Sequence, residues 1–322
     1  MNVAKTLLLP VIVYCIFYLT SGGKFGTPAS LASTMRNTVQ SLIMAWGLMF
    51  ILGANMWDFS GGAQIFLTAL TSVQIITNLN LGAVGVVMLL VVLNVVMRAV
   101  VGLIYTVVRA PSMVVTLALC MIFESICKFV FGYGAVLNNP NASMIADAPW
   151  CFLLLAIVAV FTVFFWNYTQ FSYHVRALGS GEKVARNIGL QPMTVRFKVF
   201  LVQGVYLGCA AAMLLGTRGN VQAPVNLSSF TLVFDALMTV FIGTALEKYS
   251  NRIIGVAVGA VVMKMITSGL LASGVNSAWQ MTITGIFLAL FIGISTNLKR
   301  ISQYFANRKR AAAANEKFAQ VS

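Results

Sequence analysis

The sequence predicts an all-α integral membrane protein built from about ten transmembrane helices. Hydrophobic residues make up 59% of the 322-residue chain and charged residues only 9%, which is far from the balance of a soluble domain. Apolar runs of about 20 residues, the length that crosses a bilayer, recur from one end of the chain to the other. These observations together indicate one helical membrane domain.

The apolar runs divide the chain into candidate spans. The first run resembles a signal peptide in length, but no convincing small-residue cleavage site follows it, so we expect a retained helix. We expect residues 1–298 to form a single transmembrane domain that includes a cytoplasmic segment at 170–192, followed by a basic cytoplasmic tail at 299–322. The candidate spans are 6–20, 37–55, 62–79, 82–108, 112–131, 149–167, 194–216, 229–246, 252–272 and 279–297.

The basic residues indicate topology. A net charge of +14 would suggest nucleic-acid binding in a soluble domain, but here most Lys and Arg residues lie in short loops beside hydrophobic segments. If both termini face the cytoplasm, the opposite side holds only Lys24, Arg36, Lys128 and Arg218. This bias predicts two cytoplasmic termini, and it leaves membrane lipid, not nucleic acid, as the surrounding partner.

The most polar long stretch is HVRALGSGEKVARNIGL, at residues 174–190. Within it, Gly181 to Ile188 is predicted to form a two-turn helix, with Glu182 in the positive first turn and Gly189 at its end. So short a helix is unstable alone and needs a partner or the membrane surface. The alternative is a solvated basic loop that only obeys the topology rule.

No residue pattern supports catalysis or a metal site in this chain. There is a single histidine, His174, with no nucleophile paired to it in its segment, and there is no GxxxxGKS phosphate loop. The five cysteines lie in or beside apolar segments without CxxC spacing, so we expect them to pack in the core. If the chain is a transporter, it must therefore take its energy from another protein.

Two gapless patterns carry a family resemblance. The polar segment contains ALGxxExxxRxxG, at Ala177 to Gly179, Glu182, Arg186 and Gly189. The second pattern runs through Val240 to Leu246, Arg252, Gly255, Gly259, Ala260, Gly269, Gly274, Val275 and Gln280, with shorter matches at 57–62, 109–111 and 234–236. In these residues the chain resembles the permease subunits of ribose-type (ribose-, xylose- or galactose-like) sugar ABC importers, in the branched-chain amino-acid and sugar permease superfamily.

The resemblance implies an ABC importer permease fold in the prokaryotic cytoplasmic (inner) membrane, moving a pentose, hexose or related polar solute by alternating access. It implies that ATP and Mg are bound by a separate ATP-binding cassette ATPase, so the chain itself holds no cofactor and is not an enzyme. The other implied partners are an extracytoplasmic solute-binding protein and a second permease copy or a paralogous permease. The residues expected to couple to the ATPase are Gly179, Glu182, Val184, Arg186, Ile188 and Gly189.

Other transport classes stay open. Related permeases carry nucleosides or branched-chain amino acids, and a secondary transporter is a further alternative, although no inverted repeat is visible. The chain also departs from the resembling family at Glu247 to Asn251, where that family has a glycine-rich turn. Charged and aromatic residues cannot adopt glycine's positive φ as freely, so we expect different geometry at this turn.

Polar residues inside the spans are candidates for the solute pathway, because polar groups there are costly and need partners. We expect the pathway to include Asn55, Asp58, Ser60, Asn94 and Asp235. Helix capping is the alternative for the WDFSGG segment, and an interhelical hydrogen bond is the favoured alternative for Asn94. Glu124 is expected to pair with Lys128 on the same helix face.

Lys264 lies in the middle of an apolar run and needs a partner in the membrane. The eighth and ninth spans are joined by a short turn around Tyr249, with Asp235 fourteen residues before Tyr249 and Lys264 fifteen residues after it. Residues equally far from the turn lie level in an antiparallel pair, which predicts an ion pair between Asp235 and Lys264. The alternatives are that Lys264 faces a water-filled cavity or extends its side chain toward the interface.

Overall fold

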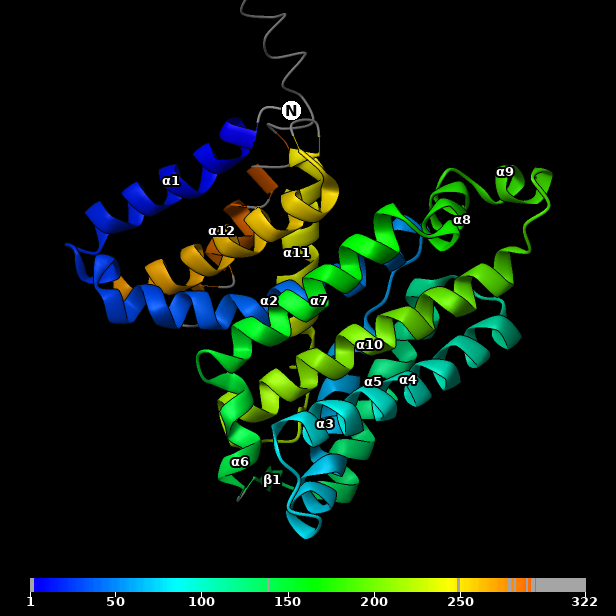
Figure 1. The fold of residues 1–322 in the computed structure, drawn as a ribbon, viewed down its shortest axis with the longest axis horizontal. Helices are drawn as coiled ribbons and strands as arrows, with labels where there is room; N and C mark the ends of the chain where they lie inside the picture. Colours follow the sequence, from blue (N-terminus) through cyan, green and yellow to red (C-terminus); the bar gives the residue numbers. More distant parts are fainter. Residues whose placement is uncertain are drawn as a thin grey trace, which may run out of the picture.

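A computed structural model describes the chain as a bundle of tilted helices (Figure 1). The long helices correspond to the first nine predicted spans, although α2 begins nine residues before its predicted span at 37–55: α1 Val3–Thr20, α2 Pro28–Gly53, α3 Ser60–Asn78, α4 Ala83–Val108, α5 Ser112–Phe131, α7 Trp150–Asn167, α10 Pro192–Arg218, α11 Phe230–Leu246 and α12 Arg252–Ala272. The described residues are 3–137, 139–247, 250–276, 279–280, 282–287, 289–290 and 293. Those of the tenth predicted span are helical, and the predicted tail at 299–322 lies outside the described residues.

By length and composition, five of these helices are long and apolar enough to cross a membrane: α4, α5, α7, α10 and α12. Most of the exposed large side chains on α4 and α7 are apolar, including Val84, Met88, Leu153 and Ile157. Such surfaces are stable only against lipid or another apolar partner. The all-α membrane fold predicted from composition is therefore confirmed.

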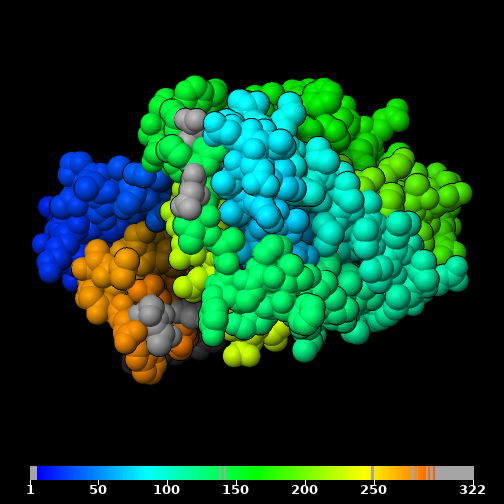
Figure 2. Space-filling view, turned by 90° about the horizontal axis from the view of Figure 1, so that it is seen from below, coloured from blue at the N-terminus to red at the C-terminus, as the bar shows by residue number. Residues whose placement is uncertain are grey.

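Helix α10 forms the centre of the bundle and packs antiparallel against α4. The backbones of the two helices touch along this interface. A Cβ atom on Gly204 would overlap the backbone of Val95, and one on Gly208 would overlap the backbone of Val91. Small residues allow helices to approach closely in a membrane, where packing replaces the hydrophobic effect as the main driving force. The space-filling view shows α1 and α12 on one flank and α4 and α5 on the other (Figure 2).

Two helices begin deep inside the bundle, and their N-termini meet. Gly62, near the start of α3, lies so close to the carbonyl oxygen of Ser229, just before α11, that a Cβ atom would not fit. Glu124 is twelve residues into α5, roughly 18 Å from its start, and accepts N–H bonds from Leu227 (2.8 Å) and Ser229 (3.0 Å). A carboxylate at this point satisfies N–H groups that have no partner within the helix.

The predicted pairing of Glu124 with Lys128 is therefore wrong. The Glu124 carboxylate is turned toward the start of α11, whereas the Lys128 ammonium lies 4.4 Å from the centre of the Tyr133 ring. The i,i+4 rule considers one helix alone. Here a neighbouring helix offers two backbone donors, and an unpaired buried N–H group costs more than an exposed lysine without a salt bridge.

Short elements occupy the two ends of the bundle (Figure 1). One end carries α8 Gln170–Gly179 and α9 Glu182–Asn187. The other carries α6 Pro140–Ser143, η2 Met144–Ala146 and an antiparallel pair of two-residue strands, β1 Ala135–Val136 and β2 Asn220–Val221. The 3-10 turn η1 Lys24–Gly26 links α1 to α2.

Candidate functional site

A polar cavity of about 420 Å³ lies between α2, α10, α11 and α12. Three charged side chains line it, those of Arg218, Asp235 and Lys264. Uncharged hydrogen-bonding side chains supply most of the remaining wall, at Asn37, Gln40, Ser41, Thr267, Ser268 and Gln280. Such a cavity suits a polar solute, because hydroxyl groups leaving water need donors and acceptors in its place.

The predicted contact between Asp235 and Lys264 forms part of this cavity. Lys264 Nζ lies 2.5 Å from Asp235 Oδ2, and the Ser41 hydroxyl donates to the same oxygen at 2.8 Å. The two charged side chains are 18% and 19% exposed, so both reach the cavity. The sequence left two alternatives for Lys264, an ion pair with Asp235 and a position facing a cavity. In the structure the Lys264 side chain does both.

A second intramembrane ion pair joins Asp58 to Arg98. Arg98 NH2 lies 2.9 Å from Asp58 Oδ2, and both side chains are fully buried. Ser60 donates its hydroxyl to Asp58 Oδ1 at 2.7 Å, and Gln203 donates to Oδ2 at 2.7 Å. The backbone N–H of Ser60 also donates to Asp58, so the carboxylate caps α3 while it joins α4 and α10.

Sequence reasoning missed Arg98, although the signal was present. It is the one charged residue in the apolar run Ala83–Val108. A guanidinium inside a span requires an acid nearby for the same reason that Lys264 does. Most Lys and Arg residues lie in loops, and Asp58 and Arg98 are 40 residues apart, so no spacing rule pairs them as the turn around Tyr249 pairs Asp235 with Lys264.

The remaining pathway candidates lie in different surroundings. Asn94 is fully buried, donates to Thr68 Oγ1 at 2.9 Å and accepts from Gln64 at 3.0 Å, which is the interhelical bonding given as its alternative. Asn55 is exposed just after α2, with a left-handed φ of 56°. Of the five candidates Asp235 alone lines the cavity, while Asp58, Ser60 and Asn94 are enclosed by protein.

The segment predicted to couple to an ATPase contains the expected short helix, α9, between Gly181 and Gly189. Both glycines have positive φ, 137° and 80°, which explains why the helix begins and ends there. Glu182 contacts Arg186 at 2.7 Å and Arg196 of α10 at 3.0 Å. The hydrogen bond from Arg186 and the charge of Arg196 hold the pKa of Glu182 below its ordinary value.

No described residue covers the outer face of α9. Val184 is 47% exposed and Ile188 is 62% exposed, so the predicted apolar edge points away from the bundle. Gly179 has a different role, because it packs against the carbonyl group of Gly53 so closely that any side chain would overlap it. This contact attaches the end of α8 to the end of α2, the helix that also carries Ser41.

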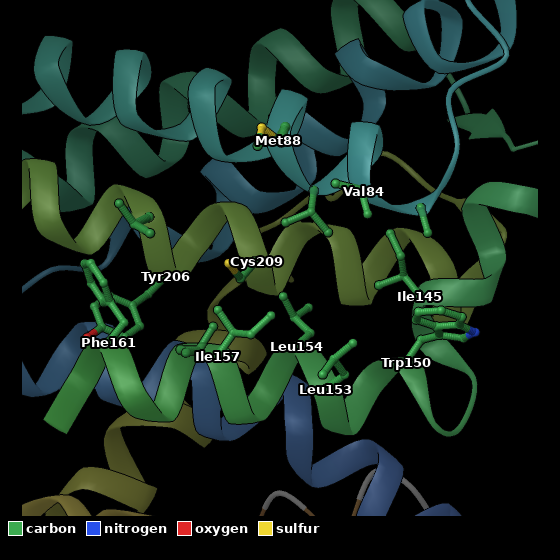
Figure 3. A pocket seen from close by; sticks show the side chains of 14 residues that line it. Val84, Met88, Ile145, Trp150, Leu153, Leu154, Ile157, Phe161, Tyr206 and Cys209 are labelled. Atoms are coloured by element: carbon green, nitrogen blue, oxygen red, sulfur yellow. The ribbon is translucent and has the colours of Figure 1, made fainter. Parts of the chain in front are cut away.

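An apolar pocket of about 300 Å³ lies between α4, α7 and α10 (Figure 3). Its wall includes Val84, Leu153 and Ile157, and the hydroxyl group of Tyr206 is already hydrogen-bonded to Thr162 at 3.0 Å. The pocket offers a sugar almost nothing to bind. Its composition suits contact with lipid, and the polar cavity remains the candidate solute site.

Comparison with known proteins decides the family. The family model for the branched-chain amino acid transport system permease component matches residues 30–292, most of the chain. The chain belongs to this permease family. It is a membrane-spanning transport subunit, and membership implies a multi-pass protein of the bacterial inner membrane.

Individual relatives of the permease are distant, and two of them match most of its length. It is 23% identical to the ribose import permease protein RbsC of Escherichia coli (strain K12) over 88% of this chain and 91% of that protein. It is 23% identical to the galactose/methyl galactoside import permease protein MglC of Haemophilus influenzae, over 79% of this chain and 82% of that protein. The xylose transport system permease protein XylH of the same organism is 28% identical over 47% of this chain and 40% of that protein. No solved structure matches the permease.

Proposed function

We propose that this permease imports a sugar by alternating access, driven by a separate ATP-binding cassette ATPase. The observation that carries the proposal is the polar cavity, whose wall presents both acceptors and donors to a solute. Asp235 Oδ1 makes no hydrogen bond to any described residue, and Lys264 uses one of its three N–H donors within the described structure. Vicinal hydroxyl groups, which both donate and accept, match such a pair.

The family relatives support the same substrate class, since proteins named for ribose, galactose and xylose are all similar to this chain. Branched-chain amino acids, which the family description names, fit less well, because their side chains need an apolar pocket and this cavity is largely polar. The proposed partners are an ATPase that binds ATP and Mg, an extracytoplasmic solute-binding protein, and a second permease copy or a paralogous permease.

The exposed edge of α9 supports ATPase docking at that end of the bundle. An apolar pair at i,i+4 spacing is the arrangement that inserts into a groove on a partner. In the proposed orientation this end and both termini face the cytoplasm, and Arg218, at the far end of α10, lies on the extracytoplasmic side.

The test is reconstitution of the permease with its ATPase and binding protein in proteoliposomes. We expect ATP-dependent uptake of radiolabelled ribose, galactose or xylose, and ATPase activity stimulated by the sugar-loaded binding protein. Radiolabelled leucine added in parallel distinguishes the amino-acid alternative. Uptake that depends on a proton or sodium gradient and proceeds without the ATPase would contradict the proposal.

A further inference from the structure

The polar cavity carries a positive charge that no acid in the described structure neutralises. Asp235 and Lys264 balance each other, and Arg218 is the third charged group on the wall. Every described acid is engaged elsewhere: Asp58 with Arg98, Asp147 with Arg36, Glu182 with Arg186 and Arg196, Asp235 with Lys264, Glu247 with Arg252, and Glu124 with backbone N–H groups. The described cavity therefore has a net charge of +1.

Arg218 is held in place without its charge being neutralised. Its guanidinium carbon lies 5.4 Å from the centre of the Phe66 ring, on neighbouring α3. A ring contact of this kind fixes the plane of the guanidinium but leaves the N–H groups at its edge available. The side chain is exposed and lines the cavity, so a solute can reach it.

The charged groups on the cavity wall thus offer two kinds of chemistry. Asp235 and Lys264 together are neutral and, with Ser41, present donors and acceptors for hydroxyl groups. Arg218 offers up to five donors and no acceptor, in the planar geometry that binds a carboxylate through two parallel hydrogen bonds. A neutral sugar satisfies the Asp235, Lys264 and Ser41 groups and leaves the Arg218 guanidinium without a negatively charged partner.

From this division, and on the basis of the proposed sugar import, we propose that the permease takes a sugar acid: a monosaccharide with one carboxylate, which binds Arg218 while its hydroxyl groups contact Asp235 and Lys264. One negative charge on the solute neutralises the one unbalanced positive charge of the cavity. Charge-assisted hydrogen bonds are roughly twice as strong as neutral ones, so the carboxylate should dominate selectivity at this site.

The test measures binding to the full-length permease in phosphatidylcholine nanodiscs by saturation-transfer-difference NMR, with D-galacturonate and D-galactose as matched probes. We expect galacturonate to bind about tenfold more tightly than galactose, the difference that one charge-assisted contact supplies. Arg218→Gln should reduce this preference to within about twofold, mainly by weakening galacturonate binding, and Arg218→Lys should retain part of it.

Arg36→Gln is the matched control, because Arg36 lies on α2 but pairs with Asp147 and does not line the cavity. It should leave the preference intact. Equal affinities, no detectable binding of either probe, or a preference that survives in Arg218→Gln would overturn the proposal. So would a preference abolished by adding phosphatidylglycerol, since Arg218 would then serve lipid headgroups.

The outcome is independent of the test of sugar import. NMR binding requires no ATP, ATPase or binding protein, so equal affinities would remove the sugar acid and leave ATP-driven uptake of neutral sugars standing. Absence of ATP-driven uptake of galacturonate as well as of the neutral sugars, together with selective galacturonate binding, would contradict the importer function instead. If Arg218→Gln weakens only docking of the binding protein, the residue belongs to that interface and the proposal fails.

Discussion

Asp58–Arg98 and Asp235–Lys264 are ion pairs of similar geometry, with N–O distances of 2.9 and 2.5 Å, in different surroundings. The first is enclosed by α3, α4 and α10 and has no exposed side-chain surface. The second lies on the wall of a polar cavity, with about a fifth of each side chain exposed. The Asp58–Arg98 pair thus holds helices together, whereas the Asp235–Lys264 pair offers unused hydrogen-bonding groups to a solute.

The largest expected effect concerns the enclosed pair. Arg98→Met should lower the free energy of unfolding by about 3–5 kcal/mol, because it leaves the Asp58 carboxylate buried without its cation. The measurement is SDS-induced unfolding of the purified permease, together with the amount of protein in the membrane. Asp58→Leu combined with Arg98→Met should be milder than either single change, since no charge is then stranded. Wild-type stability in Arg98→Met would show that the pair does not hold α3 and α4 together.

A smaller loss of stability is expected at the cavity. Lys264→Met should cost about 1–3 kcal/mol, since water in the cavity can still solvate Asp235 and Ser41 still donates to it. Transport should fall much more than stability does. Uptake per folded permease molecule, compared with that of the control variant Thr71→Ala at an exposed position of α3, measures the difference. A stability loss equal to that of Arg98→Met, with normal uptake by the surviving protein, would remove the distinction between the two pairs.

Still smaller effects on stability are expected at α9, because Glu182 and Val184 are neither enclosed by protein nor part of the cavity wall. Val184→Asp and Glu182→Arg should change the free energy of unfolding by less than about 0.5–1 kcal/mol. They should nevertheless uncouple ATP hydrolysis from uptake, because they alter the exposed edge and the contacts with Arg186 and Arg196. Lys183→Gln is the control on the same helix. Full uptake in both variants would refute the docking role of α9.

The smallest effect is the pH response of α9. Because the folded-state pKa of Glu182 lies below its ordinary value, its contacts stabilise the segment above the ordinary glutamate pKa of about 4.3 and are lost as pH falls through the lower value. Hydrogen exchange of α9, corrected for intrinsic rates, should rise in that acidic range. Glu182→Gln should remove the pH dependence, and an unchanged response in this variant would assign it to another group.

Much of this fold was predictable because its determinants are local. Apolar runs set the helices, and Gly181 and Gly189 set the ends of α9 through their backbone freedom. Counting residues on either side of one turn predicted that Lys264 and Asp235 lie at the same height in adjacent helices. This prediction needed only one short connection between two consecutive helices. Lys248 and Tyr249 of that turn lie outside the described residues, while Glu247 pairs with Arg252 and Asn251 caps α12.

What the sequence could not provide was the set of contacts between distant segments. Glu124 reaches residues more than one hundred positions away, and Asp58 reaches Gln203 across a similar separation. No periodicity encodes such pairings, because they depend on two helices that begin inside the bundle. The cavity likewise joins four helices, so sequence reasoning selected Asp235 but not Arg218.

The most direct test of the central claim, that solute reaches the Asp235–Lys264 cavity and not the Asp58–Arg98 pair, is cysteine accessibility. The background is Cys15→Ser, which removes the exposed native thiol and leaves the four buried ones. In nanodiscs, Ser268→Cys on the cavity wall should react with a water-soluble methanethiosulfonate reagent, and a transported sugar should slow the reaction. Ser60→Cys, beside Asp58, should not react. Rapid, sugar-protected modification of Ser60→Cys with an unreactive Ser268→Cys would contradict the account.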